Sequence, residues 1–311
     1  MKTVFTLTCV FFMLSNLCSQ TKEINTLSTS PYEVHTVELS EDLRVAYVDE
    51  GTNDRVLLFV HGLGSSLQAW NKNIETLKKD YRCIALDLPG YGQSSMGDYS
   101  FKTTFFGETV LAFMKKLELE NVVLVGHSMG GHTAIQTVLA NDENVEKLVL
   151  VAPAGFEVFI EGESQFLKNY FTPTLVKSAT KEQVAKNVEI NFHKMPDDAQ
   201  FMIDDRLALE HTPAFEAYCE MIPKCIAGML DEPVFDQLST IKIPTLILFG
   251  ENDGLIPNRY LHPALNPAQV ATNGHEQITN SKLILLPETG HFVQWEQAAK
   301  FNEYLVAFLE E

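Results

Sequence analysis

The most constraining feature of this chain is a strand-like run that breaks into a Gly-x-Ser-x-Gly pentapeptide. The apolar, β-branched run at 122–125 leads into Gly-His-Ser-Met-Gly at 126–130, and the residues at 133–139 have the pattern of a helix. A strand, a sharp turn and a helix are the context in which this pentapeptide forms a nucleophile elbow. Glycines on both sides of Ser128 allow neighbouring backbone to approach, so that the serine hydroxyl can be exposed above the strand. The segment therefore predicts a nucleophilic serine at the end of a buried strand.

Strand patterns and helical patterns alternate along much of the chain. The run at 55–60 is continuously apolar and of strand length, which is typical of a strand buried on both faces. Further strands are predicted at 81–86, 145–151, 244–249 and 282–286. Helical spacing occurs between these runs and at the end of the chain; it is found around Trp70, at 103–117 and at 294–309. This alternation predicts parallel strands joined by right-handed crossovers. The segments 33–39 and 44–48 are expected to pair antiparallel, because only a short polar turn joins them.

The alternation is interrupted from Phe156 to about Pro233. This stretch has helical patterns with scattered aromatic residues and prolines, and no convincing strand. Structureless segments of about eighty residues are rare in compact domains, so we expect an inserted helical cap. The predicted organisation is a first core part at 20–155, a cap at 156–235 and a second core part at 236–311.

The composition limits the partners that the protein can have. The chain has 311 residues, 45% of them hydrophobic, and a formal charge of −18. This hydrophobic content supports one large core, or a core with a subdomain. Nucleic acid and anionic membranes bind basic patches, and the chain contains no run of Lys and Arg that would supply one. Neither is therefore expected as a partner, and the acidity is interpreted as an aid to solubility.

The N-terminal segment 1–19 has the pattern of a signal peptide. Lys2 supplies a positive charge, and the run at 4–14 is apolar apart from two threonines. This run is too short to span a bilayer, and no other segment predicts a transmembrane helix. Cleavage after Ser19 would make the protein secreted or periplasmic. A lipoprotein acylated at Cys18 is the second choice, because the bulky Leu17 precedes the cysteine where a small residue is expected.

The cysteines do not indicate a disulfide framework. Loss of the N-terminal segment leaves Cys83, Cys219 and Cys225, which is an odd number. Cys83 lies in an apolar run and is interpreted as a small buried hydrophobic residue. Pro223 is expected to interrupt any helix between Cys219 and Cys225, where two free thiols are favoured over a bridge. The Cys and His residues show no metal-ligand spacing, so no metal site is predicted.

Two further residues complete a candidate catalytic triad with Ser128. A serine hydroxyl needs a base within hydrogen-bond reach and a third group that orients the base. In open parallel sheets such groups lie on loops at the carboxyl ends of the strands. Asp253 follows the predicted strand at 244–249, and His291 follows the one at 282–286. The order Ser, Asp, His is the one expected when the elbow comes first, so we predict Ser128 as nucleophile, Asp253 as acid and His291 as base.

Each assignment has a simpler alternative. Asp253 lies next to a glycine and could be a turn residue, and Glu251 is a second candidate for the acid. His291 could be a surface histidine beside a helix N-terminus. His127 and His132 are too close to the nucleophile in sequence to reach its hydroxyl, and are interpreted as structural. The position of the acid and the base at strand ends, in the expected order, favours the catalytic interpretation.

The tetrahedral intermediate of acyl transfer also needs backbone N–H donors for its oxyanion. One candidate is the amide of Met129, at the start of a predicted helix, where the helix dipole favours negative charge. The loop after the first buried strand, His-Gly-Leu-Gly at 61–64, offers Leu63 as the second donor. His61 is interpreted as a scaffold residue of this loop rather than as a catalyst.

Taken together, these motifs resemble those of α/β-hydrolase-fold serine hydrolases of the capped, carboxylesterase-like kind. The resemblance runs from about residue 33 to the C-terminus; its pieces are His-Gly-Leu-Gly at 61–64, Leu-Pro-Gly-Tyr-Gly-Gln-Ser at 88–94, Gly-His-Ser-Met-Gly-Gly at 126–131, Gly-Glu-Asn-Asp-Gly-Leu-Ile-Pro at 250–257 and Gly-His at 290–291. It implies a mostly parallel, twisted sheet of about eight strands flanked by helices, with an inserted helical cap. Dehalogenases and epoxide hydrolases of the family have Asp at the elbow, so Ser128 argues against both.

The resemblance also implies an activity. Ser128, Asp253 and His291 correspond to the catalytic triad, and the N–H groups of Leu63 and Met129 to the oxyanion hole. The expected reaction is hydrolysis of a small-molecule carboxylic ester through an acyl-enzyme, without a metal or organic cofactor. Hydrolysis of a carbon–carbon bond in a dienoic acid is the nearest alternative, and lactonase, lipase and amidase activities also remain open. A ligand-binding homologue with little or no turnover is an alternative of another class.

Two regions bear on the substrate pocket. Aromatic residues of the cap are expected to shape an apolar pocket, although about half of them are expected to be cap core only; they are Phe156, Phe159, Phe166, Tyr170, Phe171 and Phe201. The segment 258–280 is longer and more polar than expected between the acid and the last strand. Its prolines and its Asn273-Gly274 pair predict an extra surface loop near the rim of the site.

Overall fold

A sheet of eight strands forms the centre of the computed structural model, which describes residues 22–23, 30–141 and 143–311. The predicted signal peptide, 1–19, lies outside the described residues. The strands are β2 (His35–Ser40), β3 (Leu43–Glu50), β4 (Val56–Val60), β5 (Arg82–Leu86), β7 (Val122–His127), β8 (Val145–Val151), β9 (Thr245–Gly250) and β10 (Ser281–Leu286). Their order across the sheet is β10-β9-β8-β7-β4-β5-β3-β2. Only β2 and β3 run antiparallel to their neighbours, so the predicted mostly parallel sheet is confirmed.

The buried strands separate two hydrophobic layers because successive side chains point to opposite faces. In β4, Leu58 and Val60 pack into one layer, whereas Leu57 and Phe59 pack into the other. The first layer is covered by α2 (Thr103–Lys116), α3 (Met129–Ala140) and α9 (Pro267–Gln277). The second is covered by the 3-10 helix η1 (Leu67–Trp70) and by α1 (Asn71–Leu77), α10 (Val293–Glu296) and α11 (Ala298–Leu309). Helices on both faces explain why the central strands β4 and β7 are apolar along most of their length.

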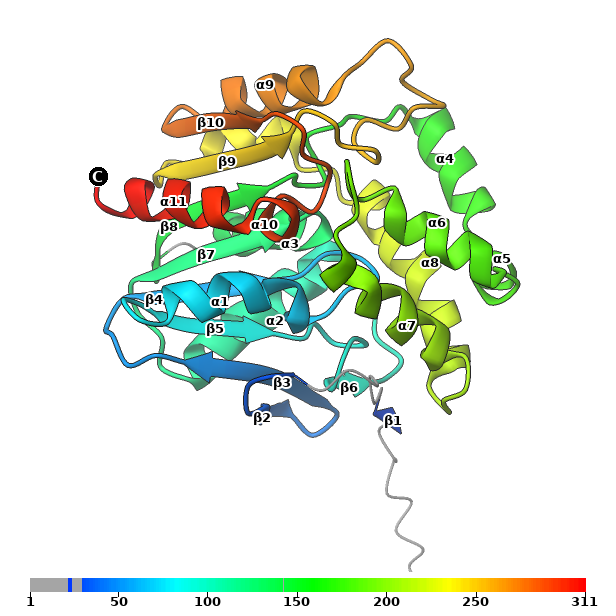
Figure 1. The fold of residues 1–311 in the computed structure, drawn as a ribbon, viewed down its shortest axis with the longest axis horizontal. Coiled ribbons are helices and arrows are strands. Elements are labelled where there is room, and N and C mark those ends of the chain that lie inside the picture. Colours follow the sequence, from blue (N-terminus) through cyan, green and yellow to red (C-terminus); the bar gives the residue numbers. More distant parts are fainter. Residues whose placement is uncertain (1–21, 24–29, 142) are drawn as a thin grey trace, which may run out of the picture.

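Five helices lie between β8 and β9, and we call residues 156–235 the cap segment. These helices are α4 (Glu161–Tyr170), α5 (Pro173–Lys177), α6 (Lys181–Glu189), α7 (Gln200–Leu209) and α8 (Phe215–Asp231), accompanied by the short η2 (Asp197–Ala199) and η3 (Phe235–Thr240). Figure 1 shows α4 to α8 grouped at the side toward which β9 points, which is the carboxyl end of the parallel strands. A separate two-stranded sheet pairs β1 (Lys22–Glu23) with β6 (Ser95–Met96). In the described part of the chain, no helix is both long and apolar enough to cross a membrane.

Three local predictions were wrong, and the first concerns the end of the chain. The helix expected at 294–309 is divided into α10 and α11 at Gln297, whose φ of −122° and ψ of 44° are not helical. Trp295 of α10 and Phe301 and Leu305 of α11 pack into the same hydrophobic layer. Hydrophobic spacing therefore continues across the break, and the sequence pattern does not reveal it.

The second wrong prediction is the surface loop at 258–280, because most of its second half is the helix α9. The side chain of Asn266 accepts a hydrogen bond from the amide of Gln269, and Pro267 occupies the first turn. Asn followed by Pro is an N-terminal helix signal as well as a turn signal. Gly274 lies within α9 because the ring of Phe156 occupies the space that a Cβ would need.

The third wrong prediction is the interruption at Pro223, since α8 continues through it from Phe215 to Asp231. Proline inside a helix costs about 3 kcal/mol. The helix buries a row of side chains, each worth about 1.5–3 kcal/mol, which outweighs that cost; they include Tyr218, Cys219, Met221, Ile222 and Cys225. Cys219 and Cys225 are both free thiols.

Hydrogen bonds fasten the cap segment to the core at its C-terminal end. The Glu232 carboxylate accepts bonds from the amide of Thr104 at 2.8 Å and from the hydroxyl of Thr103 at 2.9 Å. Helix α2 has no side-chain N-cap of its own, because its N-cap residue is Lys102. Glu232 therefore caps α2 from a distant part of the chain, and its backbone carbonyl also accepts a bond from His132 Nε2 at 2.9 Å.

A second fastening lies at the start of the cap segment. His262, on the loop after β9, has its Nδ1 2.5 Å from Glu157 Oε1 and its Nε2 3.4 Å from Glu163 Oε2. The amide of Asn258 donates to the same Glu157 oxygen at 2.8 Å. Burial disfavours the His262 imidazolium, but the hydrogen bonds and charges of both glutamates outweigh burial and raise the pKa of His262 above 6.5. The loop that carries Asp253 is thus tied to the first turn of the cap.

We predict that Glu232→Ala lowers the free energy of unfolding by about 1–2 kcal/mol, the usual cost of a lost helix cap. The loss arises because the amide of Thr104 and the hydroxyls of Thr103 and Thr104 lose their acceptor. Urea unfolding followed by circular dichroism measures it. Glu232→Gln keeps one acceptor oxygen and should lose less. Equal stability of Glu232→Ala and the wild type would contradict the capping role.

Candidate active site

The elbow places Ser128 in a backbone conformation that L-residues rarely adopt. Its φ is 54° and its ψ is −118°, directly between the end of β7 and the start of α3. A Cβ at Gly126 would overlap the carbonyl oxygen of Gly130, and one at Gly130 would overlap the carbonyl oxygens of Val60 and His61. Only glycine permits these approaches, so the two glycines allow the strain that turns the serine out of the strand.

Asp253 and His291 meet at the carboxyl ends of β9 and β10. His291 Nδ1 lies 2.7 Å from Asp253 Oδ2, and the two side chains are 2% and 0% exposed. The other oxygen, Asp253 Oδ1, accepts the amides of Leu255 at 2.8 Å and Ile256 at 3.0 Å. The carboxylate is therefore held by three donors when His291 donates from Nδ1, which leaves the Nε2 of His291 as an acceptor. Glu251, the alternative acid, is exposed to solvent.

His127 connects this pair to the elbow. Its Nε2 lies 3.1 Å from the carbonyl oxygen of His291, and the two ring centroids are 4.7 Å apart. Burial and the neighbouring His291 hold the pKa of His127 well below 6.5. A neutral ring beside His291 adds no charge that would oppose protonation of the base. The structure therefore brings His291 beside the residue that precedes Ser128, with Asp253 behind it.

The loop that carries Leu63 is held by His61. The Nδ1 of His61 lies 2.8 Å from the carbonyl oxygen of Gly62, and its Nε2 accepts the amide of Leu88 at 3.0 Å. Burial lowers the pKa of His61 to about 4, so the ring is neutral at physiological pH. Met129 begins α3 on the other side of Ser128. The two predicted oxyanion donors thus lie just beyond the ends of the neighbouring strands β4 and β7.

Tyr91 contacts both the loop of Leu63 and the side chain of Met129. Its motif at 88–94 gave no indication of these contacts. The hydroxyl accepts the backbone N–H of Gly64, which follows Leu63, and lies 4.0 Å from the Sδ of Met129. It donates to Cys225 Sγ of α8 at 3.3 Å. Burial raises the pKa of Tyr91 well above 10, so the hydroxyl remains protonated. Tyr91 therefore links the oxyanion loop, the elbow and the cap segment.

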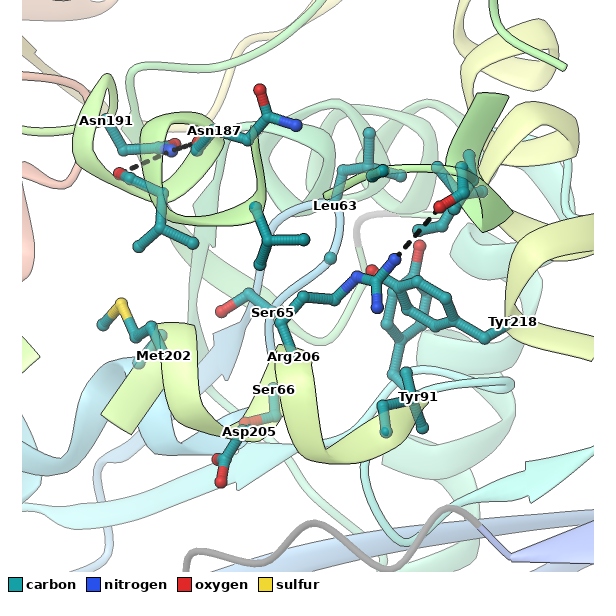
Figure 2. A pocket seen from close by; sticks show the side chains of 18 of the residues that line it. Leu63, Ser65, Ser66, Tyr91, Asn187, Asn191, Met202, Asp205, Arg206 and Tyr218 are labelled. Carbon is teal, nitrogen blue, oxygen red and sulfur yellow. Dashed lines mark hydrogen bonds between the residues drawn. The ribbon is translucent and has the colours of Figure 1, made fainter. Parts of the chain in front are cut away.

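A cavity of about 340 Å³ opens between the Leu63 loop and the cap segment. Most of its lining is apolar and comes from α5, α6, α7 and α8, with Phe292 contributing from the residue after His291. Arg206 is the cation of the lining, and its guanidinium lies 4.8 Å from the ring centre of Tyr218. Figure 2 shows Arg206 reaching from α7 toward Tyr91 and Tyr218, whereas the carboxylate of Asp205 points away from the guanidinium. Sequence patterns gave no signal for Arg206, because its contacts with the rings of Phe215 and Tyr218 of α8 direct it inward.

The six cap aromatics that were expected either to line the pocket or to form cap core fall into three groups. Phe171 and Phe201 line the cavity, as predicted. Phe156 is buried against Phe249, and Phe159 stacks on His262. Phe166 and Tyr170 were expected at the pocket but are exposed on α4. Within the described ranges, no group of three or more His, Cys, Asp or Glu side chains is arranged to hold a metal ion.

Comparisons with known proteins agree with this fold. The sequence model of the alpha/beta hydrolase fold family matches residues 55–173, which include β4, the elbow and β8. A probable hydrolytic enzyme from Pseudomonas aeruginosa superimposes with a TM-score of 0.82 at 23% identity, over 90% of this chain and 95% of the other. The chain is a hydrolase with the α/β-hydrolase fold.

Other relatives differ in what they cleave. An esterase from Exiguobacterium antarcticum has a TM-score of 0.75 at 22% identity, over 90% of this hydrolase and all of the other chain. A 2-hydroxy-6-oxononadienedioate/2-hydroxy-6-oxononatrienedioate hydrolase from Pseudomonas putida is 29% identical over 277 residues, 86% of this chain and 92% of the relative. These relatives agree on hydrolysis and differ in substrate.

We predict that Tyr91→Phe lowers the kcat for a small ester about tenfold while KM changes little, because an oxyanion donor that loses its support stabilises the transition state less. Steady-state kinetics measure this. Cys225→Ala is the matched control: it removes the acceptor of the tyrosine hydroxyl but leaves the Gly64 hydrogen bond, and should retain most of kcat. A raised KM with unchanged kcat in Tyr91→Phe would show that the residue only lines the cavity.

Proposed function

We propose that this hydrolase cleaves carboxylic esters through an acyl-enzyme on Ser128. The observation that carries the proposal is the buried hydrogen bond between His291 Nδ1 and Asp253 Oδ2, because it leaves the opposite nitrogen of His291 free to accept a proton. A half-buried elbow serine with a buried His–Asp pair beside it suits acyl transfer.

In the proposed reaction, His291 accepts the proton of the Ser128 hydroxyl as its oxygen attacks the ester carbonyl. The N–H groups of Leu63 and Met129 stabilise the oxyanion that forms. His291 then protonates the leaving alcohol, and the acyl group remains on Ser128. A water molecule, deprotonated by His291, hydrolyses this acyl-enzyme and restores the serine. Asp253 holds the ring of His291 and stabilises its charged form throughout.

We predict that Ser128→Ala reduces hydrolysis of p-nitrophenyl esters by about 10⁴-fold or more, because the nucleophile is lost. Absorbance of released p-nitrophenol measures the rate, and circular dichroism checks the fold. A fluorophosphonate probe should label the wild type and not the variant. Ser239→Ala, at an exposed serine on η3, is the matched control. Full turnover by Ser128→Ala would refute the site, and a folded wild type that resists the probe would favour a non-catalytic binding protein.

A second candidate function, hydrolysis of a carbon–carbon bond in a dienoic acid, is favoured by Arg206. The relative from Pseudomonas putida acts on a dienedioate, which has two carboxylates. An otherwise largely apolar cavity with one inward-directed guanidinium suits a substrate with an apolar body and a negative end. The same triad serves this reaction, so substrate charge is the feature that separates the two candidates.

We predict that Arg206→Met lowers kcat/KM for an acid-bearing substrate relative to a neutral ester by about 10- to 100-fold, which corresponds to the 1.5–3 kcal/mol of a hydrogen bond to a charged group. The assay compares p-nitrophenyl butyrate with 2-hydroxy-6-oxononadienedioate. Lys300→Met, at an exposed cation on α11, is the control and should leave the ratio unchanged. An unchanged ratio in Arg206→Met would exclude a carboxylate-binding role for this residue, and no turnover of the dienedioate by the wild type would exclude the second candidate.

A further inference from the structure

The exposed apolar side chains of this protein are gathered in one region. Every large hydrophobic residue that is exposed in the described part of the chain lies at 158–190 or at 255–265. Tyr260 is 94% exposed and Ile160 is 69% exposed. We call the following residues the apolar rim: Val158, Ile160, Phe166, Tyr170, Leu175 and Tyr260. Scattered exposed hydrophobic residues are ordinary, but their segregation on one side of a molecule indicates an interaction surface.

The two segments that supply the apolar rim form one surface. The ring of Phe159 stacks on His262 with centroids 5.2 Å apart, and Glu157 bonds both His262 and the amide of Asn258. These contacts hold 156–163 against 258–262. Figure 1 shows the loop before α9 descending beside the N-terminal end of α4. The apolar rim therefore spans the start of the cap and the loop that follows Asp253.

Helix α4 is apolar on its outer side as well as its inner side. Leu167 is buried, whereas Phe166 and Tyr170 are each 55% exposed. Residues four apart lie on the same face of a helix, and the rings of Phe166 and Tyr170 stack there with centroids 6.2 Å apart. A helix that only covered a core would be polar on this outer face.

The apolar rim continues into the cavity beside the loop of Leu63. The Tyr170 ring contacts the ring of Phe171, which lines the cavity, at a centroid distance of 5.1 Å. Leu175 both lines the cavity and is 37% exposed. A residue that does both marks a place where the cavity reaches the surface. The apolar surface thus leads from the outside of α4 to the opening of the cavity.

The charge of this region differs from that of the whole protein. The chain has a net charge of −18, but residues 161–189 contain four lysines and four glutamates, so helices α4 to α6 are neutral. A neutral, apolar face on an acidic molecule does not suit an anionic or a cationic partner. It suits an uncharged or zwitterionic apolar phase.

We propose that the apolar rim docks this hydrolase onto a neutral or zwitterionic lipid surface, with the cavity opening toward the lipid. The inference rests on the proposed function only for what happens to a lipid acyl group after it enters the cavity. A protein partner or a second copy on this face would cover the opening beside Leu175, whereas a lipid surface would supply substrate to it. Tyrosines at the edge of an apolar face fit a lipid–water boundary, where the ring is buried and the hydroxyl remains hydrated.

The test is sedimentation with phosphatidylcholine vesicles, using Ser128→Ala protein so that no lipid is consumed. This protein should bind the vesicles, and replacing half of the lipid by phosphatidylglycerol should weaken binding because the protein is acidic. The variant Ile160→Ser/Phe166→Ser/Tyr170→Ser/Tyr260→Ser should bind at least about tenfold more weakly, because each lost side chain removes apolar area that the lipid would bury. All four side chains are exposed, and a circular dichroism melt checks that the variant folds.

A matched control changes three exposed polar residues away from the cap segment and should bind like the parent; it is Thr52→Ser/Asn53→Ser/Asn280→Ser. Protein that stays in the supernatant, or equal binding by the rim variant, would overturn the proposal. A dimer of the parent that becomes a monomer in the rim variant would also overturn it, in favour of a second copy on this face. The readout is independent of catalysis. If the wild type hydrolyses no ester but the protein still binds vesicles, the proposed function alone is refuted. If the wild type hydrolyses esters but the protein does not bind vesicles, lipid docking alone is refuted.

Discussion

Close approach of the backbone at Gly126 and Gly130 is the constraint on which the rest of the site depends. Gly130 is packed against the carbonyl oxygens of Val60 and His61, so the elbow is locked onto the end of the neighbouring strand β4. That contact fixes Ser128 relative to the loop of Leu63 and relative to α3, whose first amide belongs to Met129. A single methyl group at either glycine would move the nucleophile and both predicted oxyanion donors apart. The order of the strands positions the other two residues of the triad. Because β8, β9 and β10 follow β7 across the sheet, Asp253 and His291 lie at the same edge as Ser128.

Neutral histidines surround this edge. Burial lowers the pKa of both His61 and His132 to about 4, and holds that of His127 well below 6.5. Each makes a hydrogen bond to a backbone carbonyl, so each acts as an uncharged crosslink between loops. The base His291 is the exception, because its partner is the carboxylate of Asp253 rather than a carbonyl. This contrast explains why the motifs around the elbow contain several histidines although the proposed reaction needs one.

The sequence predicted those parts of the fold whose physics is local. The continuous apolar run predicted at 55–60 matches the observed strand β4, because a strand buried on both faces is apolar along its length. The pairing of Asp253 with His291 followed from strand ends in a parallel sheet. Features that depend on distant packing were not predictable: Gln297 breaks a helix whose hydrophobic spacing is unbroken, and α9 begins at an Asn-Pro pair that is also a turn signal. Arg206 and Tyr91 gained their positions only from how α7 and α8 lie over the sheet.

The attachment of residues 156–235 has a consequence for how this scaffold can diversify. The segment leaves the sheet after β8 and returns before β9, and it is clasped to the rest by His262 at one end and by Glu232 at the other. Neither clasp includes Ser128 or His291. Between the clasps, residues 190–193 pack against Gly254 and Gly290, beside Asp253 and His291, so an ancestor could exchange the helices on either side of this stretch while keeping the reactive centre. New substrate preferences would then arise by replacing a module, while the catalytic strands accumulate few changes.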